Sequence, residues 1–153
     1  MKKLLFTLLI FCTISFGTKA QEIKVLPTNQ ETARFPDGWH KFQLQGVVFD
    51  VEIISGSYTQ GNVTWLDGTT YSGRLRGAFI SGRGTYTWSS GSRYEGSFKR
   101  SQRHGKGSLI LVNGQKWSGK WKNNKKNGKG KVFDKNGEII KTGLWEDDQL
   151  VKK

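Results

Sequence analysis

Cysteine is nearly absent from the sequence, and this limits the chemistry that the chain can carry. Cys12 is the only cysteine among 153 residues, and it lies inside the apolar N-terminal stretch 4–16. If that stretch is removed during export, as the residues around it indicate, the remaining chain has no thiol. Disulfide bonds, thiol catalysis and thiolate metal sites are then excluded. We expect no lipid anchor on Cys12, because Phe11 stands where such a site needs a small residue.

Histidine is also scarce, and the usual catalytic motifs are missing. His40 and His104 are the only histidines, and there is no H-x-x-H pair and no G-x-S-x-G motif. The Gly-Lys-Gly-Lys run at 128–131 does not open a predicted helix, as a phosphate-binding loop would. A carboxylate pair for sugar hydrolysis stays open, since it can be assembled from distant residues. We nevertheless expect no enzyme, no catalytic residue, no metal and no cofactor.

Long apolar runs are missing except at the N-terminus. Lys2 and Lys3 precede the apolar residues 4–16, and Thr18-Lys19-Ala20 follows as a small-residue cleavage site. This is the layout of a secretory signal peptide over residues 1–20. The run is shorter than the roughly 20 residues that cross a bilayer easily. We expect cleavage after Ala20 and a protein in the periplasm or outside the cell, including the membrane surface; the alternative is an uncleaved anchor.

Acidic residues are outnumbered by basic ones. The chain has 25 Lys and Arg against 12 Asp and Glu, a net charge of +13. Three of the lysines lie in residues 1–20, so 22 basic residues remain after cleavage. A strongly basic exported protein attracts phospholipid head groups, acidic glycans or acidic proteins. Nucleic acid suits the charge but not the compartment, so we expect no nucleic-acid partner.

Glycine, by contrast, is abundant and regularly spaced. Of 20 glycines, 17 lie between Gly56 and Gly143, and three lines of 23 residues align without gaps over 71–139. An aromatic residue opens each line, and glycine recurs at places 3, 12, 14 and 21. Such a period is the signature of a repeat architecture. The main repeat positions are Tyr71, Gly73, Gly82, Gly84, Tyr94, Gly96, Gly105, Gly107, Trp117, Gly119, Gly128 and Gly130.

Each line predicts a β-hairpin. In the middle line we expect a first strand at 94–99, a polar loop at 100–104, a second strand at 107–112 and a tight turn at Asn113-Gly114. Alternate residues share a face, so rings and glycines fall on one side. A ring can lie flat over a glycine and cover backbone that would otherwise be wetted. The sequence therefore predicts a one-layer sheet without a large core.

The middle line, YEGSFKRSQRHGKGSLILVNGQK, resembles the MORN (membrane occupation and recognition nexus) repeat, whose pattern is close to Y-E-G-x-W/F-K-x-G-x-x-H-G-x-G. The resemblance covers about residues 56–148. It implies an all-β, elongated, single-layer antiparallel meander, with scaffolding, dimerisation or membrane-surface roles and no catalytic activity. Leu75 and Asp134 depart from the pattern. The units are a partial one at 56–70, full ones at 71–93, 94–116 and 117–141, and a partial one at 142–148 after a one-residue slip.

The segments outside the repeats are short. Residues 21–35 are polar and contain Pro27, which predicts a linker. Residues 36–55 contain two β-rich stretches, 39–44 and 47–54, and we expect them to cap the sheet. Residues 149–153 are expected to be a basic tail.

The cations of the repeats form a concentrated patch. Residues 94–131 hold eleven Lys or Arg and one acid, Glu95. By the strand numbering, cations at places 4, 6, 13 and 15 point away from the aromatic face, and loop cations join them. The patch is either a strip that binds an anionic surface or the solvated face of a thin sheet. The binding hypothesis rests on Lys99, Arg100, Arg103, Lys106, Lys120, Lys122, Lys125, Lys126 and Lys129.

The aromatic residues leave a second function open. We expect most rings to cover glycines and one another, but an apolar face can also mark an interaction site. An unpaired strand edge is a further pairing site. The alternative to surface attachment is therefore a protein scaffold or a homodimer that acts through the aromatic face or a sheet edge.

Overall fold

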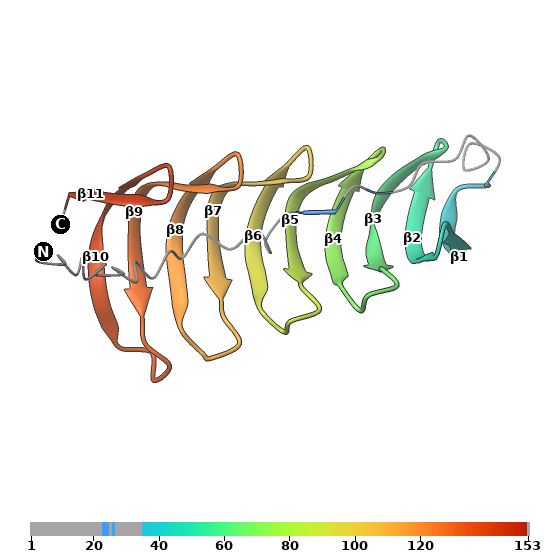
Figure 1. Cartoon of the computed structure of the whole chain (residues 1–153). Coiled ribbons are helices and arrows are strands. Elements are labelled where there is room, and N and C mark those ends of the chain that lie inside the picture. Colours follow the sequence, from blue (N-terminus) through green and yellow to red (C-terminus); the bar gives the residue numbers. More distant parts are fainter. Residues whose placement is uncertain (1–22, 25, 27–34, 153) are drawn as a thin grey trace, which may run out of the picture.

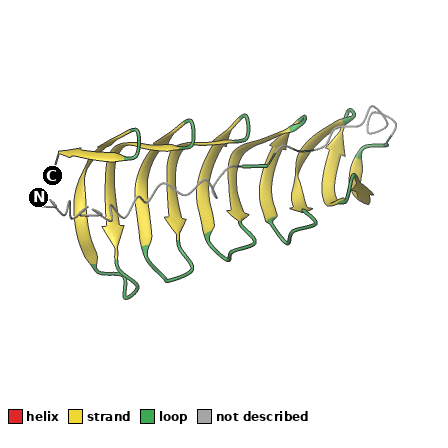
Figure 2. Cartoon of the chain, in the orientation of Figure 1, coloured by secondary structure: helices red, strands yellow, loops and turns green. Residues whose placement is uncertain are grey.

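The computed structural model describes residues 23–24, 26 and 35–152, and every regular element in this part of the chain is a β-strand (Figures 1 and 2). The strands form one sheet in sequence order, each antiparallel to the next. The predicted single-layer meander is confirmed. The strands are β1 (Gly38–Leu44), β2 (Val47–Ile54), β3 (Ser57–Thr64), β4 (Thr70–Arg76), β5 (Phe79–Thr87), β6 (Arg93–Lys99), β7 (Gln102–Ile110), β8 (Lys116–Lys122), β9 (Lys125–Phe133), β10 (Ile139–Glu146) and β11 (Gln149–Lys152).

A row of glycines crosses the sheet at right angles to the strands. Gly96 on β6 pairs with Gly84 on one side and with Gly107 on the other, and the same pairing continues in both directions. The row therefore has no side chains on the face where the rings lie. It consists of Gly61, Gly73, Gly84, Gly96, Gly107, Gly119, Gly130 and Gly143, one on each strand from β3 to β10.

The predicted ring-over-glycine packing is confirmed in each full repeat. A Cβ added at Gly84 would lie 2.5 Å from Oη and 2.6 Å from Cε2 of Tyr71. Tyr94 covers Gly107 in the same way, and the indole of Trp117 covers Gly130. Each ring occupies the space that a side chain on the neighbouring strand would need, so glycine is the residue that this close approach requires.

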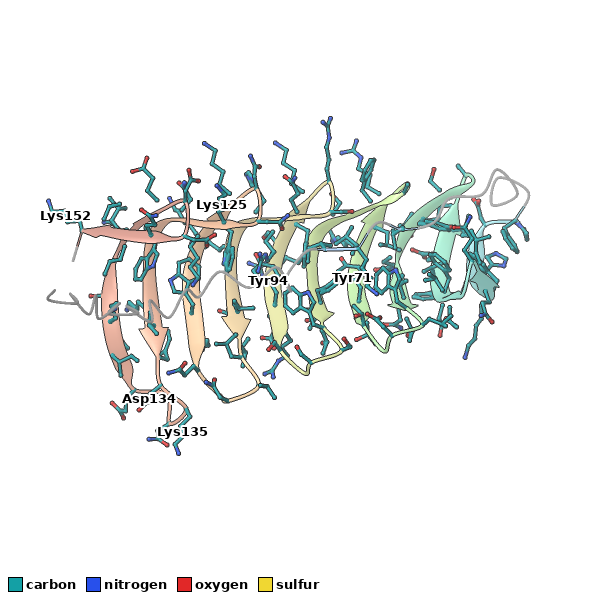
Figure 3. All side chains as sticks on the ribbon, viewed as in Figure 1. Tyr71, Tyr94, Lys125, Asp134, Lys135 and Lys152 are labelled. Atoms are coloured by element: carbon teal, nitrogen blue, oxygen red, sulfur yellow. The ribbon has the colours of Figure 1, made fainter. Side chains whose placement is uncertain are left out.

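The buried rings continue along the array as a strip of edge-on contacts. Phe98 packs against Tyr94 at 5.0 Å between ring centroids, and Trp121 packs against Tyr94 at 5.3 Å. Trp117 then packs between Trp121 and Trp145 in two further edge-on contacts. Edge-to-face geometry suits the charge distribution of aromatic rings. The strip thus replaces a globular core, and Tyr71 and Tyr94 lie along it in Figure 3.

A bulge interrupts the second strand of each full repeat. Gly105 lies where the β6–β7 register shifts, between the Gly96 and Phe98 pairs, and its φ is +72°. Bulges increase local twist and bend the strand. The hairpin ends of β7 and its equivalents consequently curve over at the upper edge in Figure 1. The same shift recurs in the β4–β5 and β8–β9 pairs.

The loop expected at 100–104 is wrong, because the hairpin closes in two residues. Arg100 and Ser101 have φ of 49° and 58°, the pattern of a type I′ turn, and β7 already begins at Gln102. Residues 102–104 of the expected loop therefore lie inside the strand. At the opposite edge, the predicted strand end at 112 is also wrong. β7 ends at Ile110, and Leu111 N–H donates to the Gln115 carbonyl across a longer turn.

The Asn113-Gly114 turn differs from the one predicted. Only Gly114 has a positive φ, +85°, and its N–H donates to the Leu111 carbonyl at 2.9 Å. Asn113 instead accepts the Gln115 N–H on Oδ1 at 3.0 Å. The turn is therefore a type I turn followed by a left-handed glycine, which also suits a hairpin.

The two-residue turns clip each hairpin to the preceding one. The Asn124 N–H donates to the Arg103 carbonyl at 3.1 Å, and Asn124 Oδ1 accepts the Arg103 N–H at 2.8 Å. Ser101 makes the same pair of bonds with Ile80, and Asp148 makes it with Lys126. We call these three reciprocal pairs the turn clips. They satisfy backbone groups that would otherwise be left without partners beside the bulges.

The last repeat keeps its turn clip despite the one-residue slip in sequence. Asp148 follows Asn124 by one residue more than Asn124 follows Ser101. The β9–β10 register shifts between Ile139 and Lys141, so the extra residue is held in a bulge. Residues 149–153 were expected to be a basic tail. In the structure Gln149–Lys152 form β11, the last strand of the described sheet, which pairs with β10.

The N-terminal segments also contribute to the sheet. The strands expected at 39–44 and 47–54 are present as β1 and β2, which pair with each other and with β3. Within the segment predicted as a polar linker, Ile23 and Leu26 are buried, and the Lys24 N–H donates to Tyr86 Oη at 3.2 Å. These described residues are therefore part of the core. The signal peptide expected at 1–20 lies outside the described residues.

The ring-over-glycine packing predicts strong coupling between Gly107 and Tyr94. Gly107→Ala is expected to lower the free energy of unfolding by about 1–3 kcal/mol, because the new methyl group overlaps the Tyr94 ring. In a Tyr94→Leu background the loss should shrink by about 0.5 kcal/mol or more. Urea denaturation measures both, with the exposed Lys106→Ala as control. Additive effects of the two substitutions would contradict the packing.

Buried tyrosines predict an alkaline limit to stability. Burial raises the pKa of Tyr86 to about 12, and it raises the pKa values of Tyr71 and Tyr94 well above their usual range. Because the folded state holds these protons more tightly, their stabilising contribution is complete below pH ~10 and falls as the pH rises further. The ultraviolet absorbance of tyrosinate should therefore rise at a higher pH in the native protein than in denaturant. Coincident titrations would rule this burial out.

Candidate functional site

Five of the predicted binding cations lie on the face opposite the rings. Alternation along each strand places them there, because their neighbours in sequence, such as Phe98, Gly107 and Trp121, lie on the ring face. All five side chains are exposed. We call this surface the outer face. The five cations are Lys99, Lys106, Lys120, Lys122 and Lys129.

Lysines on the outer face stand directly opposite other lysines on the neighbouring strand. Lys106 pairs with Lys120 across β7 and β8, and Lys122 pairs with Lys125 across the end of β8 and β9. Like charges in such positions destabilise a sheet. Among the described residues, no carboxylate forms an ion pair with Lys106, Lys120 or Lys122. An anion bound between the paired lysines would remove this repulsion.

A shallow groove with a volume of about 710 Å³ runs over the outer face. One wall, the basic wall, consists of Lys and Arg side chains. The other, the polar wall, consists of hydroxyl side chains and one carboxylate. Its floor is formed by backbone of the glycine row. We call it the outer groove. It is lined by the basic residues Arg83, Lys106, Lys120 and Lys129, by Thr85, Glu95, Ser108 and Ser118, and by Gly84, Gly96, Gly107 and Gly119.

Two further predicted cations lie at the hairpin ends. Arg100 is the first residue of its two-residue turn, and Lys125 follows the next such turn. Lys125 lies at the upper edge of the sheet in Figure 3 and forms an exposed ion pair with Asp147 at 3.7 Å. Exposed pairs of this kind contribute little to stability. Arg100 and Lys125 extend the basic surface from the outer face to the edge.

The structure does not bring Arg103 to the basic surface, so the expectation that it joins from a loop is wrong. Its side chain is 5% exposed and lies on the ring face, with Cζ 4.5 Å from the Trp121 ring centroid. Nη2 donates to the Asn124 carbonyl at 2.7 Å. Burial lowers the pKa of Arg103 to about 10. The guanidinium therefore holds the hairpin together through cation–π and hydrogen-bond contacts.

Lys126 also turns toward the rings, so its predicted place on the basic face is wrong for the same reason. Its Nζ lies 5.6 Å from the Trp117 ring centroid, and burial lowers its pKa. Both errors follow from the two-residue turn. That turn pairs Arg103 with Phe98 and Lys126 with Trp121, and paired residues share a face.

The polar wall of the outer groove was missed as a site by the sequence reasoning. Ser108 Oγ donates to Ser118 Oγ at 2.9 Å across β7 and β8. Glu95 is exposed beside them and accepts from Arg93 Nε at 2.6 Å. Arg83, at place 13 of its line, is one of the cations predicted to point away from the rings, but it was not included in the binding hypothesis. The repeat period could have predicted this wall, because residues at places 2 and 15 of each 23-residue line lie on the same face of the sheet as the lysines.

The aromatic strip is not a free surface in the described structure. Tyr71, Tyr86 and Tyr94 are at most 1% exposed, and Trp117 and Trp121 are also buried. The rings therefore act mainly as core. The large apolar side chains that are exposed lie elsewhere, among them Trp39 on β1 and Val151 on β11.

Metal-ligating side chains are not clustered beside the basic surface in the part of the chain that the structure describes. The described residues contain no group of three His, Cys, Asp or Glu side chains that could hold a metal ion. His40 Nε2 lies 2.7 Å from the Pro36 carbonyl oxygen, and His104 lies on β7. Within the same residues, no helix is long and apolar enough to span a bilayer.

Comparison with known proteins agrees with the hairpin repeat. A family model described as MORN repeat matches residues 71–93, 94–116 and 117–138. No curated protein matches the chain. Proteins of this kind are in general non-catalytic binding modules. The chain is a MORN-repeat protein, with three consecutive repeats over residues 71–138.

Proposed function

We propose that this protein is an exported binding module that attaches to an anionic surface of the cell envelope through its basic outer face. The observation that carries the proposal is the cross-strand pairing of Lys106 with Lys120 and of Lys122 with Lys125. These pairs place like charges side by side on an exposed face. Such an arrangement is favourable when an anionic partner neutralises it.

The number of accessible cations supports the same proposal. Seven of the nine residues of the binding hypothesis are exposed, on the outer face or at the hairpin ends. Each Lys or Arg near an anionic membrane contributes about 1 kcal/mol. Several such contacts give useful affinity without a deep pocket. Phosphate head groups and acidic polymers share the chemistry that this face would recognise.

Export is part of the proposal and rests on sequence alone. The basic start, the apolar stretch 4–16 and the Thr18-Lys19-Ala20 site direct the chain to the periplasm or the cell exterior. The residues after position 20 contain no cysteine, so an oxidising compartment leaves their side-chain chemistry unchanged.

Sedimentation with lipid vesicles tests the surface attachment. We expect binding to vesicles that contain phosphatidylglycerol, little binding to pure phosphatidylcholine, and a steep loss as salt rises, because salt screens exposed charges over about 8 Å at physiological strength. Replacing Lys99, Lys106, Lys120 and Lys122 by Gln should weaken the binding by about 100-fold or more at low salt. The matched control replaces Lys41, Lys135, Lys141 and Lys152, which are exposed outside the basic region. Equal binding to both vesicles at all salt concentrations would argue against an electrostatic attachment.

A second candidate function, self-association, is supported by the open edge of β1. In the described sheet β1 is the first strand and pairs only with β2, so its other edge is unpaired. Trp39 on this strand is 57% exposed. Unpaired edges are templates for pairing with another chain. The buried rings give no comparable support to pairing through the aromatic face.

Light scattering tests the edge-to-edge dimer. If two copies pair through β1, the molar mass should double as concentration rises. Lys41→Pro, which removes a backbone donor that faces away from β2, should shift the protein back to the monomer. Trp39→Ser serves as a second variant that leaves the backbone unchanged. A monomer at every concentration would exclude the dimer.

A further inference from the structure

We infer that the outer groove is a binding site for a linear acidic polysaccharide, an inference that rests on the proposed attachment to an anionic surface and names its ligand. The groove runs across β5 to β9, which spans roughly 19 Å at about 4.8 Å per strand. A chain of several sugar residues fits this length. The long narrow shape suits a polymer better than the plane of a bilayer.

The two walls of the outer groove have different chemistry. The basic wall offers ammonium groups from Lys106, Lys120 and Lys129 on three successive strands. Carboxylate or sulfate groups would form charge-assisted hydrogen bonds with them. The opposite wall offers the hydroxyls of Ser108 and Ser118, which donate and accept. Sugar hydroxyls need partners of this second kind.

The charge pattern favours a glycan over a denser polyanion. β6 interrupts the basic wall, because Ser97 stands at its place in the row, across from Arg83. On the polar wall, β6 contributes Glu95, an exposed carboxylate that accepts hydrogen bonds, forms an ion pair with Arg93 and offers no cation to an anionic ligand. A polymer charged on some sugars and hydroxylated on the rest satisfies both features. Nucleic acid or polyphosphate would place charge against Glu95.

The lining of the outer groove also argues against a neutral sugar. Recognition of uncharged sugars commonly uses exposed aromatic faces, and no aromatic side chain lines this groove. The basic wall must therefore supply most of the affinity. The ligand class is a linear glycan that carries carboxylate or sulfate groups, held across the strands.

Calorimetric titration of the full chain with defined polymers tests the inference. The probes are polygalacturonate, dextran sulfate, neutral dextran, and vesicles of phosphatidylglycerol with phosphatidylcholine. We expect polygalacturonate or dextran sulfate to bind and neutral dextran not to bind. Replacing Lys106, Lys120 and Lys129 by Gln should weaken polymer binding at least about tenfold more than replacing Lys99, Arg100 and Lys122, which removes the same charge from the edge.

The two serines of the polar wall provide an independent variant. Ser108→Ala with Ser118→Ala should weaken polymer binding about fivefold and leave vesicle binding unchanged, since only the polysaccharide uses the hydroxyls. A third measurement uses the wild-type protein and compares how fast each lysine is chemically acetylated with and without bound polymer. Bound polymer should protect Lys106, Lys120 and Lys129 more than Lys99 and Lys125.

The outcomes separate this inference from the proposed function. Vesicle binding without polymer binding, or equal losses in the groove and edge variants, overturns the groove site and leaves attachment to an anionic surface standing. Binding of neutral dextran to the same extent also overturns the groove site. Absence of salt-sensitive binding to every anionic probe overturns both.

Discussion

The contact between an aromatic ring and the bare backbone of a neighbouring strand is the constraint on which this structure depends. A single sheet has no second layer to cover it, so each strand must be shielded by side chains of its own face. Tyr71, Tyr94 and Trp117 do this by lying over glycines, where any side chain would displace the ring. The hydrophobic contribution is thus distributed along the array instead of being gathered in one core.

This constraint also determines where charge can be placed. Because the ring face is filled, polar and basic side chains are left to the outer face and the hairpin ends. The exceptions are informative, since Arg103 and Lys126 enter the ring face only with aromatic partners and with pKa values lowered by burial. Basic residues that are close in sequence therefore have two different roles: some stabilise the hairpins on the ring face, and others are exposed on the outer face.

The sequence predicted the repeat, the faces of the strands and the purpose of the paired glycines, because all three follow from periodicity. It did not predict the two-residue turns. The second strand was expected to begin only at residue 107, whereas β7 begins at Gln102 and holds Gly105 in a bulge. Because the residues after each turn were assigned to a loop, Arg103 and Lys126 were predicted on the wrong face of the sheet. The contacts of Ile23 and Leu26 with the sheet could not be predicted, since nothing periodic marks residues so far from the repeats.

The turn clips and the bulge in β10 have a consequence for how the array can change in length. One edge of the sheet is locked by reciprocal hydrogen bonds that must meet in fixed phase, while the extra residue near Ile140 is absorbed toward the other edge without disturbing the clip at Asp148. Insertions and deletions are therefore tolerated asymmetrically. The longer turns are the side on which related arrays can diverge, and the clipped side keeps successive hairpins in step.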